Sequence, residues 1–404
     1  MDWYYYIAWA AIISQVLFLF YVCRNYRYAL REYKKKREWY QPKTVLIIPC
    51  KGLDAEFHEN IASFFNQDYD NFVIYFVVAD GSDPADAELH KLKDQLSEGS
   101  KARDIRILAA GQAQCCSQKI HNLLYCYERV GKDVDILAFA DSDICVRSDW
   151  LRHLVYPLRQ AKNGVASGYR WFVPKQNNPA SLALSAINAK VAQLLGNTRF
   201  NQAWGGSMAI RAEDFRRLGL DKIWPNVLSD DLSLSRAVKK AGMKVAFVPA
   251  CLAASHTATT WRGLLEFGRR QFLITRVNAP GTWWFGLLSS LYSILGLWGG
   301  AGLAIYTANT AHEHLSLFAA VPAAFFITQL GQAILRQRMI SKLLREYLQQ
   351  MRPAVAADIL GFWLWSLLLL LLIISSTFGR TIRWRGVRYK LLGPMKTVIV
   401  GDQS

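Results

Sequence analysis

Several common binding signatures are missing from this sequence of 404 residues. No Gly-x-Gly-x-x-Gly pattern follows the first apolar run, Thr44 to Pro49, and no Gly-Lys-Ser or Gly-Lys-Thr loop occurs. These absences argue against a dinucleotide fingerprint and a P-loop. The seven cysteines contain no Cys-x-x-Cys pair or other zinc spacing, so we expect reduced thiols. The net charge of +17 comes without a nucleic-acid-binding motif, and we therefore expect no nucleic-acid partner.

Long apolar stretches are present instead, and they explain most of the 52% apolar content. Four of them are long enough to cross a bilayer: Tyr4 to Cys23, Trp283 to Ala308, Leu315 to Leu335 and Ala354 to Gly379. A buried helix in a water-soluble domain rarely runs that far with so few charges. The sequence therefore predicts a multi-pass membrane protein in a lipid bilayer, with an N-terminal transmembrane anchor at 1–24 and transmembrane or interfacial helices at 282–379.

The order of charge around the first apolar stretch predicts its orientation. Basic residues follow this stretch, at Arg24, Arg27, Arg31 and 34–37, whereas a cleaved signal peptide carries them before it. The positive-inside bias then leaves the N-terminus outside and places the next domain in the cytoplasm. Three full crossings after that domain would put the basic tail, 380–404, outside. We therefore expect that one C-terminal segment is re-entrant or interfacial, or that Trp283 to Ala308 is not a crossing.

Two further segments have apolar and basic residues at helical spacing. Trp261 to Arg276 lies just before the C-terminal apolar cluster, and we expect an interfacial helix over 259–281. Arg336 to Met351 repeats the pattern, so it also predicts a helix on the membrane surface.

The region between the anchor and the first of these segments, 43–258, alternates apolar strand patterns with helical patterns. Strands are predicted at Thr44 to Pro49, Phe72 to Ala79, Ile105 to Leu108 and Asp135 to Phe139, with helical stretches between them. Such alternation is typical of an α/β domain with a mainly parallel sheet. A further strand is predicted at Lys244 to Val248.

Acidic residues stand where two of these predicted strands end. Asp80 follows one strand, and Asp141 and Asp143 follow another. Two carboxylates at i and i+2 on an extended segment point to the same side, and hard divalent cations such as Mg²⁺ accept one or two carboxylates plus substrate phosphates. Ligands of open α/β sheets gather at the carboxyl ends of the strands. An Asp-rich turn at the strand end is the alternative interpretation of the Asp-Ser-Asp alone.

Two other motifs have a structural and a functional interpretation. The glycines of Trp204-Gly205-Gly206 permit close backbone approach, either to a ligand or to another strand. Ser229-Asp230-Asp231 opens a helical stretch, and capping of that helix explains one of the two aspartates but not both. His256 is a lone histidine, and such a residue is more often structural than a ligand.

Taken together, these motifs resemble a membrane-bound family-2-type glycosyltransferase with a GT-A-type nucleotide-sugar-binding domain. Trp204-Gly-Gly-Ser-Met, Ser229-Asp-Asp-Leu-Ser-Leu and Arg269-Arg-Gln-Phe272 are similar to the plant and bacterial branch of the ceramide glucosyltransferases. The C-terminal Trp384-Arg-Gly-Val-Arg-Tyr389 is similar to the Trp-Arg-Gly-x-x-Tyr tail of such enzymes. One difference stands out: many relatives have Gln/Arg-x-x-Arg-Trp where this chain has Arg269-Arg-Gln-Phe272.

The resemblance implies a role for each motif. Asp231 would be the general base, and Asp143 with Asp141 would hold Mn²⁺ or Mg²⁺ against the donor diphosphate. The nucleotide sugar would be bound by Asp80, Lys119, Asp141, Asp143, Arg269, Arg270 and Gln271. The acceptor would be bound by Trp204, Gly205, Gly206, Asp230 and Phe272.

The expected reaction is inverting transfer of a sugar, glucose, from a UDP-sugar donor to the hydroxyl of a membrane lipid acceptor, ceramide, by a cytoplasmic catalytic domain. Other acceptors stay open: diacylglycerol, a hopanoid, polyprenyl phosphate or a polysaccharide. The alternative from another class is a non-catalytic membrane protein that binds nucleotides or lipids.

Overall fold

The computed structural model describes residues 3–54, 56–310 and 315–400. Its centre is a seven-stranded sheet with the order β3-β2-β1-β4-β6-β5-β7. The strands are β1 (Thr44–Pro49), β2 (Phe72–Val78), β3 (Asp104–Ala109), β4 (Ile136–Ala140), β5 (Asn163–Pro174), β6 (Ser207–Arg211) and β7 (Lys244–Thr257). Strand β6 runs antiparallel to β4 and β5, and the other pairings are parallel. The expected mainly parallel α/β domain is confirmed.

Both faces of this sheet are covered, which explains why its central strands are apolar throughout. Alternate side chains of β1 enter two different cores, Leu46 and Ile48 on one face and Val45 and Ile47 on the other. Helices from the chain between strands cover the sheet: α2 (Phe57–Phe65), α3 (Pro84–Leu96), α4 (Gln118–Tyr127), α5 (Trp150–Val155), α6 (Pro179–Ala192), α7 (Ala212–Arg217), α8 (Leu220–Ile223) and α9 (Asp230–Lys240).

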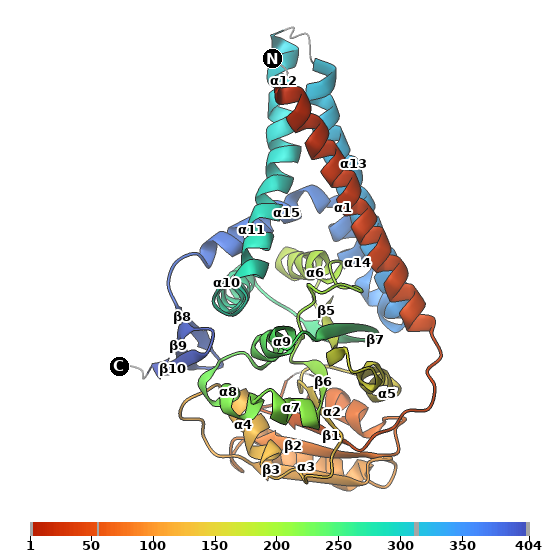
Figure 1. Ribbon diagram of the computed structural model, residues 1–404, viewed down its shortest axis with the longest axis vertical. Helices are drawn as coiled ribbons and strands as arrows, with labels where there is room; N and C mark the ends of the chain where they lie inside the picture. Colours follow the sequence, from red (N-terminus) through yellow and green to blue (C-terminus); the bar gives the residue numbers. More distant parts are fainter. Residues whose placement is uncertain (1–2, 55, 311–314, 401–404) are drawn as a thin grey trace.

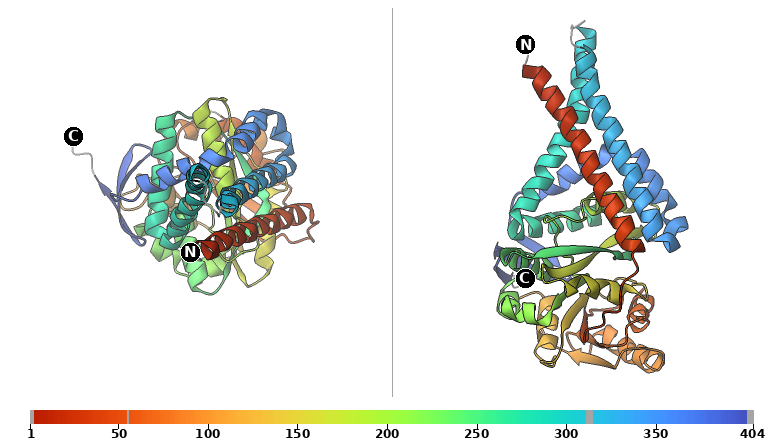
Figure 2. Two further views of the ribbon diagram at one scale, coloured as in Figure 1. Left: turned by 90° about the horizontal axis from the view of Figure 1, so that it is seen from above. Right: turned by 45° about the vertical axis from the view of Figure 1, so that its right-hand side comes forward.

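Long apolar helices rise away from the sheet domain (Figure 1). Three described helices are long and apolar enough to span a membrane: α1 (Trp3–Lys34), Pro280–Asn309 and α13 (Leu315–Leu343). The second of these consists of α11 (Pro280–Ile294), a π-helical turn at Leu295–Gly299 and α12 (Gly300–Asn309). Helices α1 and α13 lie side by side in both views of Figure 2. Residues 1–2 of the expected anchor lie outside the described residues.

The last apolar stretch is not one straight crossing. Ala354 to Gly379 contains the end of α14 (Leu348–Leu360) and all of α15 (Phe362–Ser375), and the two helices are bent by 88° at Gly361. A side chain at Gly361 would meet the ring of Trp365 at 2.6 Å, so the break needs glycine. Figure 1 shows α15 running across the base of the long helices. This geometry fits the expectation that one C-terminal segment is re-entrant or interfacial.

The prediction of an amphipathic surface helix over Arg336 to Met351 is wrong. Helix α13 ends at Leu343, a short 3-10 turn follows at Arg345–Tyr347, and α14 then begins. Arg336 is buried rather than turned to a membrane surface, because its guanidinium binds both carboxylate oxygens of the buried Asp358. The segment expected at 259–281 is helical as α10 (Trp261–Asn278).

The C-terminal segment is a small sheet rather than a plain basic tail. Strands β8 (Thr381–Trp384), β9 (Val387–Gly393) and β10 (Lys396–Val400) form an antiparallel sheet, and residues 401–404 lie outside the described residues. Apolar side chains on one face of this sheet, among them Ile382 and Tyr389, pack with Leu273 of α10 and with Leu228. The C-terminal sheet and the seven-stranded sheet therefore lie on the same side of the long helices.

Candidate active site

One large cavity, of about 1240 Å³, lies between the seven-stranded sheet and the long helices. Its polar end is formed at the carboxyl ends of β1 and β4, with Lys51, Asp141 and Asp143 in the wall. Its other end is apolar and includes Ile187 of α6 and Leu372 of α15. The cavity thus connects a charged pocket to apolar surface beneath the candidate membrane spans.

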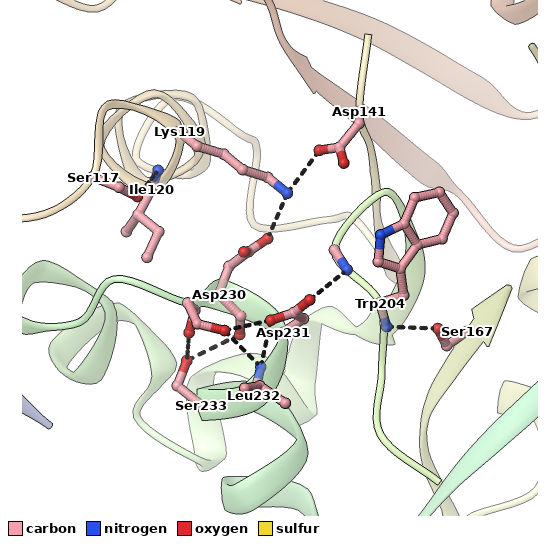
Figure 3. A network of polar contacts seen from close by, with 12 residues as sticks. Ser117, Lys119, Ile120, Asp141, Ser167, Trp204, Asp230, Asp231, Leu232 and Ser233 are labelled. Carbon is pink, nitrogen blue, oxygen red and sulfur yellow. Dashed lines mark hydrogen bonds and ion pairs between the residues drawn. The ribbon is translucent and has the colours of Figure 1, made fainter. Parts of the chain in front are cut away.

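A buried lysine organises the charged end of the cavity (Figure 3). Lys119 Nζ lies 2.7 Å from Asp141 Oδ1 and 3.1 Å from Asp230 Oδ2. The three side chains are 15%, 22% and 7% exposed, so these ion pairs are only weakly screened by water. Helix α4 presents Lys119 in its first turn, where Ser117 caps the helix by accepting a hydrogen bond from the Ile120 N–H.

The pKa values of the three groups differ because burial and neighbouring charges shift the pKa of each group by different amounts. Burial alone would lower the pKa of Lys119, but Asp141 and Asp230 outweigh burial and raise it above the ordinary value. Burial would raise the pKa of Asp141, and Lys119 followed by Arg170 instead holds it below the ordinary value. Burial raises the pKa of Asp230 to about 6, with Asp231 and Asp141 adding to the rise and Lys119 opposing it.

Asp231 is held differently from its neighbour Asp230. Its Oδ2 accepts a hydrogen bond from the Gly205 N–H at 3.0 Å, and its Oδ1 accepts from the Leu232 N–H at 2.7 Å and from the Ser229 hydroxyl. Ser229 is also the N-cap of α9, since its side chain accepts from the Leu232 N–H. Ser229 and Asp231 therefore share the capping of this N–H, and both Asp230 and Asp231 line the cavity.

The glycines of the Trp204 loop are required by close approach to charged groups and to a ring. A Cβ at Gly205 would lie 2.6 Å from Asp230 Oδ2 and 2.7 Å from Lys119 Nζ, and one at Gly206 would lie 2.1 Å from the Trp204 ring. The Trp204 N–H donates to the Ser167 hydroxyl at 2.9 Å, which fixes the start of the loop. Trp204 and Gly205 line the cavity.

Arg170 of β5 is a site residue that the sequence analysis missed. Its guanidinium lies 3.5 Å from Asp141 Oδ2 and 3.5 Å from Asp143 Oδ1, and it packs over the Trp204 ring with its centre 5.1 Å from the ring centroid. The run Val165 to Val173, rich in aromatic and β-branched residues, could have predicted the strand. Nothing in that run indicates that Arg170 meets the Asp141-Ser-Asp143 motif.

The donor set around Asp143 fits a hard divalent cation. Asp143 Oδ1 is buried and accepts no hydrogen bond from the described residues, although it forms an ion pair with Arg170 at 3.5 Å. This oxygen therefore keeps lone pairs that a hard cation could share. Within the described ranges, no group of three or more His, Cys, Asp and Glu side chains forms a complete metal site. A cation here would therefore take one or two protein carboxylates and complete its shell with water and ligand phosphates, as Mg²⁺ often does.

A family model for glycosyl transferase family 21 matches residues 6–396, almost the whole chain. The chain belongs to this family. It is a glycosyltransferase, and the residues gathered around the cavity are its candidate catalytic and substrate-binding groups.

Two solved structures are similar to this glycosyltransferase at low level. The mannosyltransferase PcManGT from Pyrobaculum calidifontis, in complex with GDP-Man and Mn2+, is 14% identical, with 90% of this chain and 98% of that chain covered and a TM-score of 0.42. GalNAc-T7 with UDP, GalNAc and Mn2+ is also 14% identical, with 55% of this chain and 45% of that chain covered and a TM-score of 0.38. Both TM-scores are low, so neither likeness bears on the function of this chain.

The remaining predicted residues of the glycosyltransferase divide between the cavity and its surroundings. Arg270, Gln271 and Phe272 of α10 line the cavity. Arg269 does not lie among the described residues of the cavity wall, because its guanidinium donates to the carbonyls of Ser375 and Phe378 at the end of α15. Helix α10 thus turns Arg270 to the cavity, whereas Arg269 contacts the end of α15, and the role of Arg269 in binding the nucleotide sugar stays a prediction.

Asp80 stands at the edge of the site, after β2, and does not line the described cavity itself. Its Oδ2 accepts from Gln112 Nε2 at 2.9 Å, and Gln112 is part of the cavity wall. Hydrogen bonds from Ser82 and then from Gln112 hold the pKa of Asp80 below its ordinary value. The carboxylate is therefore available as a charged acceptor next to the polar end of the cavity.

Proposed function

We propose that this glycosyltransferase moves glucose from UDP-glucose to the hydroxyl of a membrane lipid, with ceramide as the acceptor. The observation that carries the proposal is the continuity of the cavity. Its polar end gathers Lys119, Asp141 and Asp231, and its apolar end includes Leu184 of α6 and Phe285 of α11. A soluble acceptor would not need an apolar approach of this kind, whereas a lipid tail does, because burying it removes apolar surface from water.

The reaction follows from the charges at the polar end. The oxygen of the acceptor hydroxyl forms a bond to the anomeric carbon while the bond from that carbon to UDP breaks, and UDP leaves with the electron pair. Asp231 takes the hydroxyl proton, a step typically worth about 10² to 10⁴-fold. One displacement without a covalent intermediate inverts the anomeric carbon.

We choose Asp231 over Asp230 as the base because its carboxylate is available, and not because it is the stronger base, since the pKa of Asp230 is the one raised to about 6. Asp230 is paired with Lys119 at 3.1 Å, so its negative charge is already compensated. Asp231 keeps carboxylate lone pairs for a ligand in the cavity, although it accepts hydrogen bonds from the Gly205 and Leu232 N–H groups and from the Ser229 hydroxyl. These two backbone donors also fix the direction of the carboxylate, which keeps the base positioned for the acceptor hydroxyl.

The basic residues around the cavity would stabilise the departing diphosphate. Lys119, Arg170 and Arg270 all line it, and fixed cations aimed at a developing anion lower the barrier most in a site with little water. Mn²⁺ or Mg²⁺ held by Asp143, with Asp141 beside it, would neutralise charge on the leaving UDP. Asp80 would bind the uridine at the edge of the cavity.

For the membrane arrangement, we propose that α1, the α11–α12 helix and α13 each cross the bilayer. With the N-terminus outside, the sheet domain is then cytoplasmic, and α13 returns the chain to the cytoplasmic side. Packing of the C-terminal sheet on α10 supports this count, because that sheet must stay on the side of the catalytic domain. The bent pair α14–α15 then lies at the membrane surface, and the basic residues of 380–404 obey the positive-inside bias.

The test of this function is lipid labelling by membranes that contain the chain. Radiolabelled UDP-glucose is supplied with ceramide or diacylglycerol in parallel, with and without EDTA. We expect labelled glucosylceramide that disappears on chelation and returns with Mn²⁺. Label only in diacylglycerol would contradict the ceramide acceptor, and no label from any UDP-sugar would contradict the proposed donor.

A variant of the base separates catalysis from binding. Asp231→Asn keeps the shape of the side chain and should abolish transfer while UDP still binds. Asp94→Asn, on the exposed surface of α3, is the matched control and should transfer at the rate of the unaltered chain. Full turnover by Asp231→Asn would show that another group is the base.

A further inference from the structure

The turn between β8 and β9 carries an arginine in an unusual backbone conformation. Trp384 pairs with Val387, so Arg385 and Gly386 are the two residues of the hairpin turn. Their φ values are 47° and 88°, as in a type I′ turn, which requires positive φ at both positions. Arg385 is the one residue other than glycine with positive φ in the described part of the chain.

Asparagine is the residue that such a turn favours at the first position, because its short polar side chain tolerates the left-handed region. An arginine there costs more backbone free energy than asparagine would. Strained residues of this kind are concentrated at functional sites. The conformation of Arg385 therefore indicates that its side chain makes contacts of functional importance.

The Arg385 side chain reaches back to the loop that follows β1. Its Nη1 donates to the Lys51 carbonyl at 2.8 Å, and its Nη2 lies 3.7 Å from Asp54 Oδ2. Lys51 Nζ in turn donates to the Arg385 carbonyl at 3.3 Å. The tip of the hairpin is therefore fixed to the polar end of the cavity, and Trp384, Arg385 and Lys51 all line it.

The C-terminal sheet is packed firmly enough to position this side chain. Tyr389 and Leu391 of β9 are buried together with Leu273 of α10 and with Leu228. Leu228 immediately precedes Ser229, the cap of the helix that carries Asp230 and Asp231. The same apolar cluster thus holds both the arginine hairpin and the acidic motif.

The excess of positive charge in the cavity wall favours binding of an anionic ligand near this hairpin. Six cationic and four acidic side chains line the described cavity: Lys51, Lys119, Arg170, Lys239, Arg270 and Arg385, against Asp141, Asp143, Asp230 and Asp231. The pKa of Arg270 is lowered by burial and then by Arg170 and Arg385. Repulsion among these guanidinium groups is relieved when an anion binds between them.

We propose that Arg385, presented by the β8–β9 hairpin, is a ligand of the diphosphate of the nucleotide-sugar donor. This inference rests on the proposed function and adds a residue from the far end of the chain to the donor site. A guanidinium suits the role because its planar fork of donors matches phosphate oxygens. The C-terminal sheet is then a wall of the donor site.

Arg385→Asn is the decisive variant because it removes the guanidinium and leaves the favoured residue for the turn. If Arg385 serves only the turn, the variant should be as stable and as active as the unaltered chain. Arg388→Gln is the matched control: Arg388 lies in the same hairpin, is exposed and is absent from the described cavity wall. It changes the same charge without touching the cavity.

The measurement is calorimetric binding of UDP and of uridine to the full chain in detergent with Mn²⁺, followed by steady-state kinetics. We expect Arg385→Asn to bind UDP roughly tenfold to a hundredfold more weakly, the range for a charge-assisted hydrogen bond. Uridine, which lacks the diphosphate, should bind the variant and the unaltered chain equally. Arg388→Gln should bind both ligands as the unaltered chain does.

The outcomes separate this inference from the function on which it rests. Equal UDP affinity of Arg385→Asn and the unaltered chain would overturn the inference alone. A raised KM for the lipid acceptor with unchanged UDP affinity would also overturn it, since the anion would then belong to the acceptor. No UDP binding by the unaltered chain would overturn the proposed donor as well.

Discussion

Replacing Lys119 by methionine tests whether the buried charge cluster holds the site together. The change keeps an unbranched side chain of similar length but removes the ammonium group that lies 2.7 Å from Asp141 and 3.1 Å from Asp230. Two carboxylates are then left close together in a poorly hydrated place. Because Arg170 stays within 3.5 Å of Asp141, most of the uncompensated charge falls on Asp230.

The loss of unfolding free energy depends on whether the unpaired Asp230 stays ionised or binds a proton. Removing one partner of a buried ion pair typically costs about 3–5 kcal/mol of unfolding free energy. Asp230 can escape part of this cost by binding a proton, since its pKa is already raised to about 6 with Lys119 present. Without Lys119 the pKa of Asp230 rises further. Between pH 6 and this new pKa, each pH unit therefore adds about 1.4 kcal/mol to the loss of unfolding free energy.

The assay is unfolding of the purified chain in detergent at pH 5 and pH 8. We expect Lys119→Met to be destabilised at both pH values and much more so at pH 8, with transfer activity lost. The double variant Lys119→Met with Asp230→Asn should recover most of the loss at pH 8, because the uncompensated charge is gone. Lys240→Met, on the exposed end of α9, is the control and should stay within about 0.5 kcal/mol.

A loss below about 1 kcal/mol at pH 8, or a loss that does not change with pH, would refute the reasoning, since a buried pair should cost several times more. Failure of the double variant to recover would point to lost packing around α4 instead of lost charge compensation.

Three further predictions use the same chain in detergent. Gly205→Ala should lower activity at least tenfold, because a Cβ there would lie within 2.7 Å of Lys119 Nζ and Asp230 Oδ2, whereas Gly302→Ala has open space and should have no effect. The pKa of Asp230 is raised from 3.8 to about 6, so the folded state binds a proton that the unfolded state has already lost. The unaltered chain therefore loses stability as pH rises from about 4 to about 6, and Asp230→Asn should flatten this decline. Asp358→Ala should lower the unfolding free energy by about 3–5 kcal/mol by leaving the buried Arg336 unpaired, and the apolar double variant Arg336→Met with Asp358→Leu should lower it less.

Local patterns predicted much of the catalytic domain because its central strands are nearly continuous apolar runs. Strands β1, β2, β3 and β4 lie where the sequence indicates them, to within a residue or two at each end. Strand β7 runs on to Thr257, past the expected end at Val248, because the small residues after Val248 continue to pair with β5. His256 therefore lies at a strand end, where its ring makes a T-shaped contact with the Tyr347 ring.

The structure adds most where tertiary contacts are not visible in the local pattern. Arg336 looks like a basic residue on an amphipathic surface helix until Asp358 is found beside it. Arg269 and Arg270 are neighbours in one motif, yet helical geometry sends one to the end of α15 and the other into the cavity. The basic composition of 380–404 suggests a tail, because short strands with mixed charge show little periodicity before their partners are known.

The sequence by itself determined the class of this protein: apolar stretches of membrane length, an α/β domain between them, and acidic residues at strand ends whose order marks a glycosyltransferase. Those features are local, since hydrophobic length, strand periodicity and motif spacing are properties of short segments. Only the tertiary structure brought Arg170 to the Asp141-Ser-Asp143 motif and Arg385 to the loop after β1, and paired Lys119 with Asp230. These contacts join residues that are far apart in the chain, and they depend on strand order and on packing of the C-terminal sheet, which no single segment encodes.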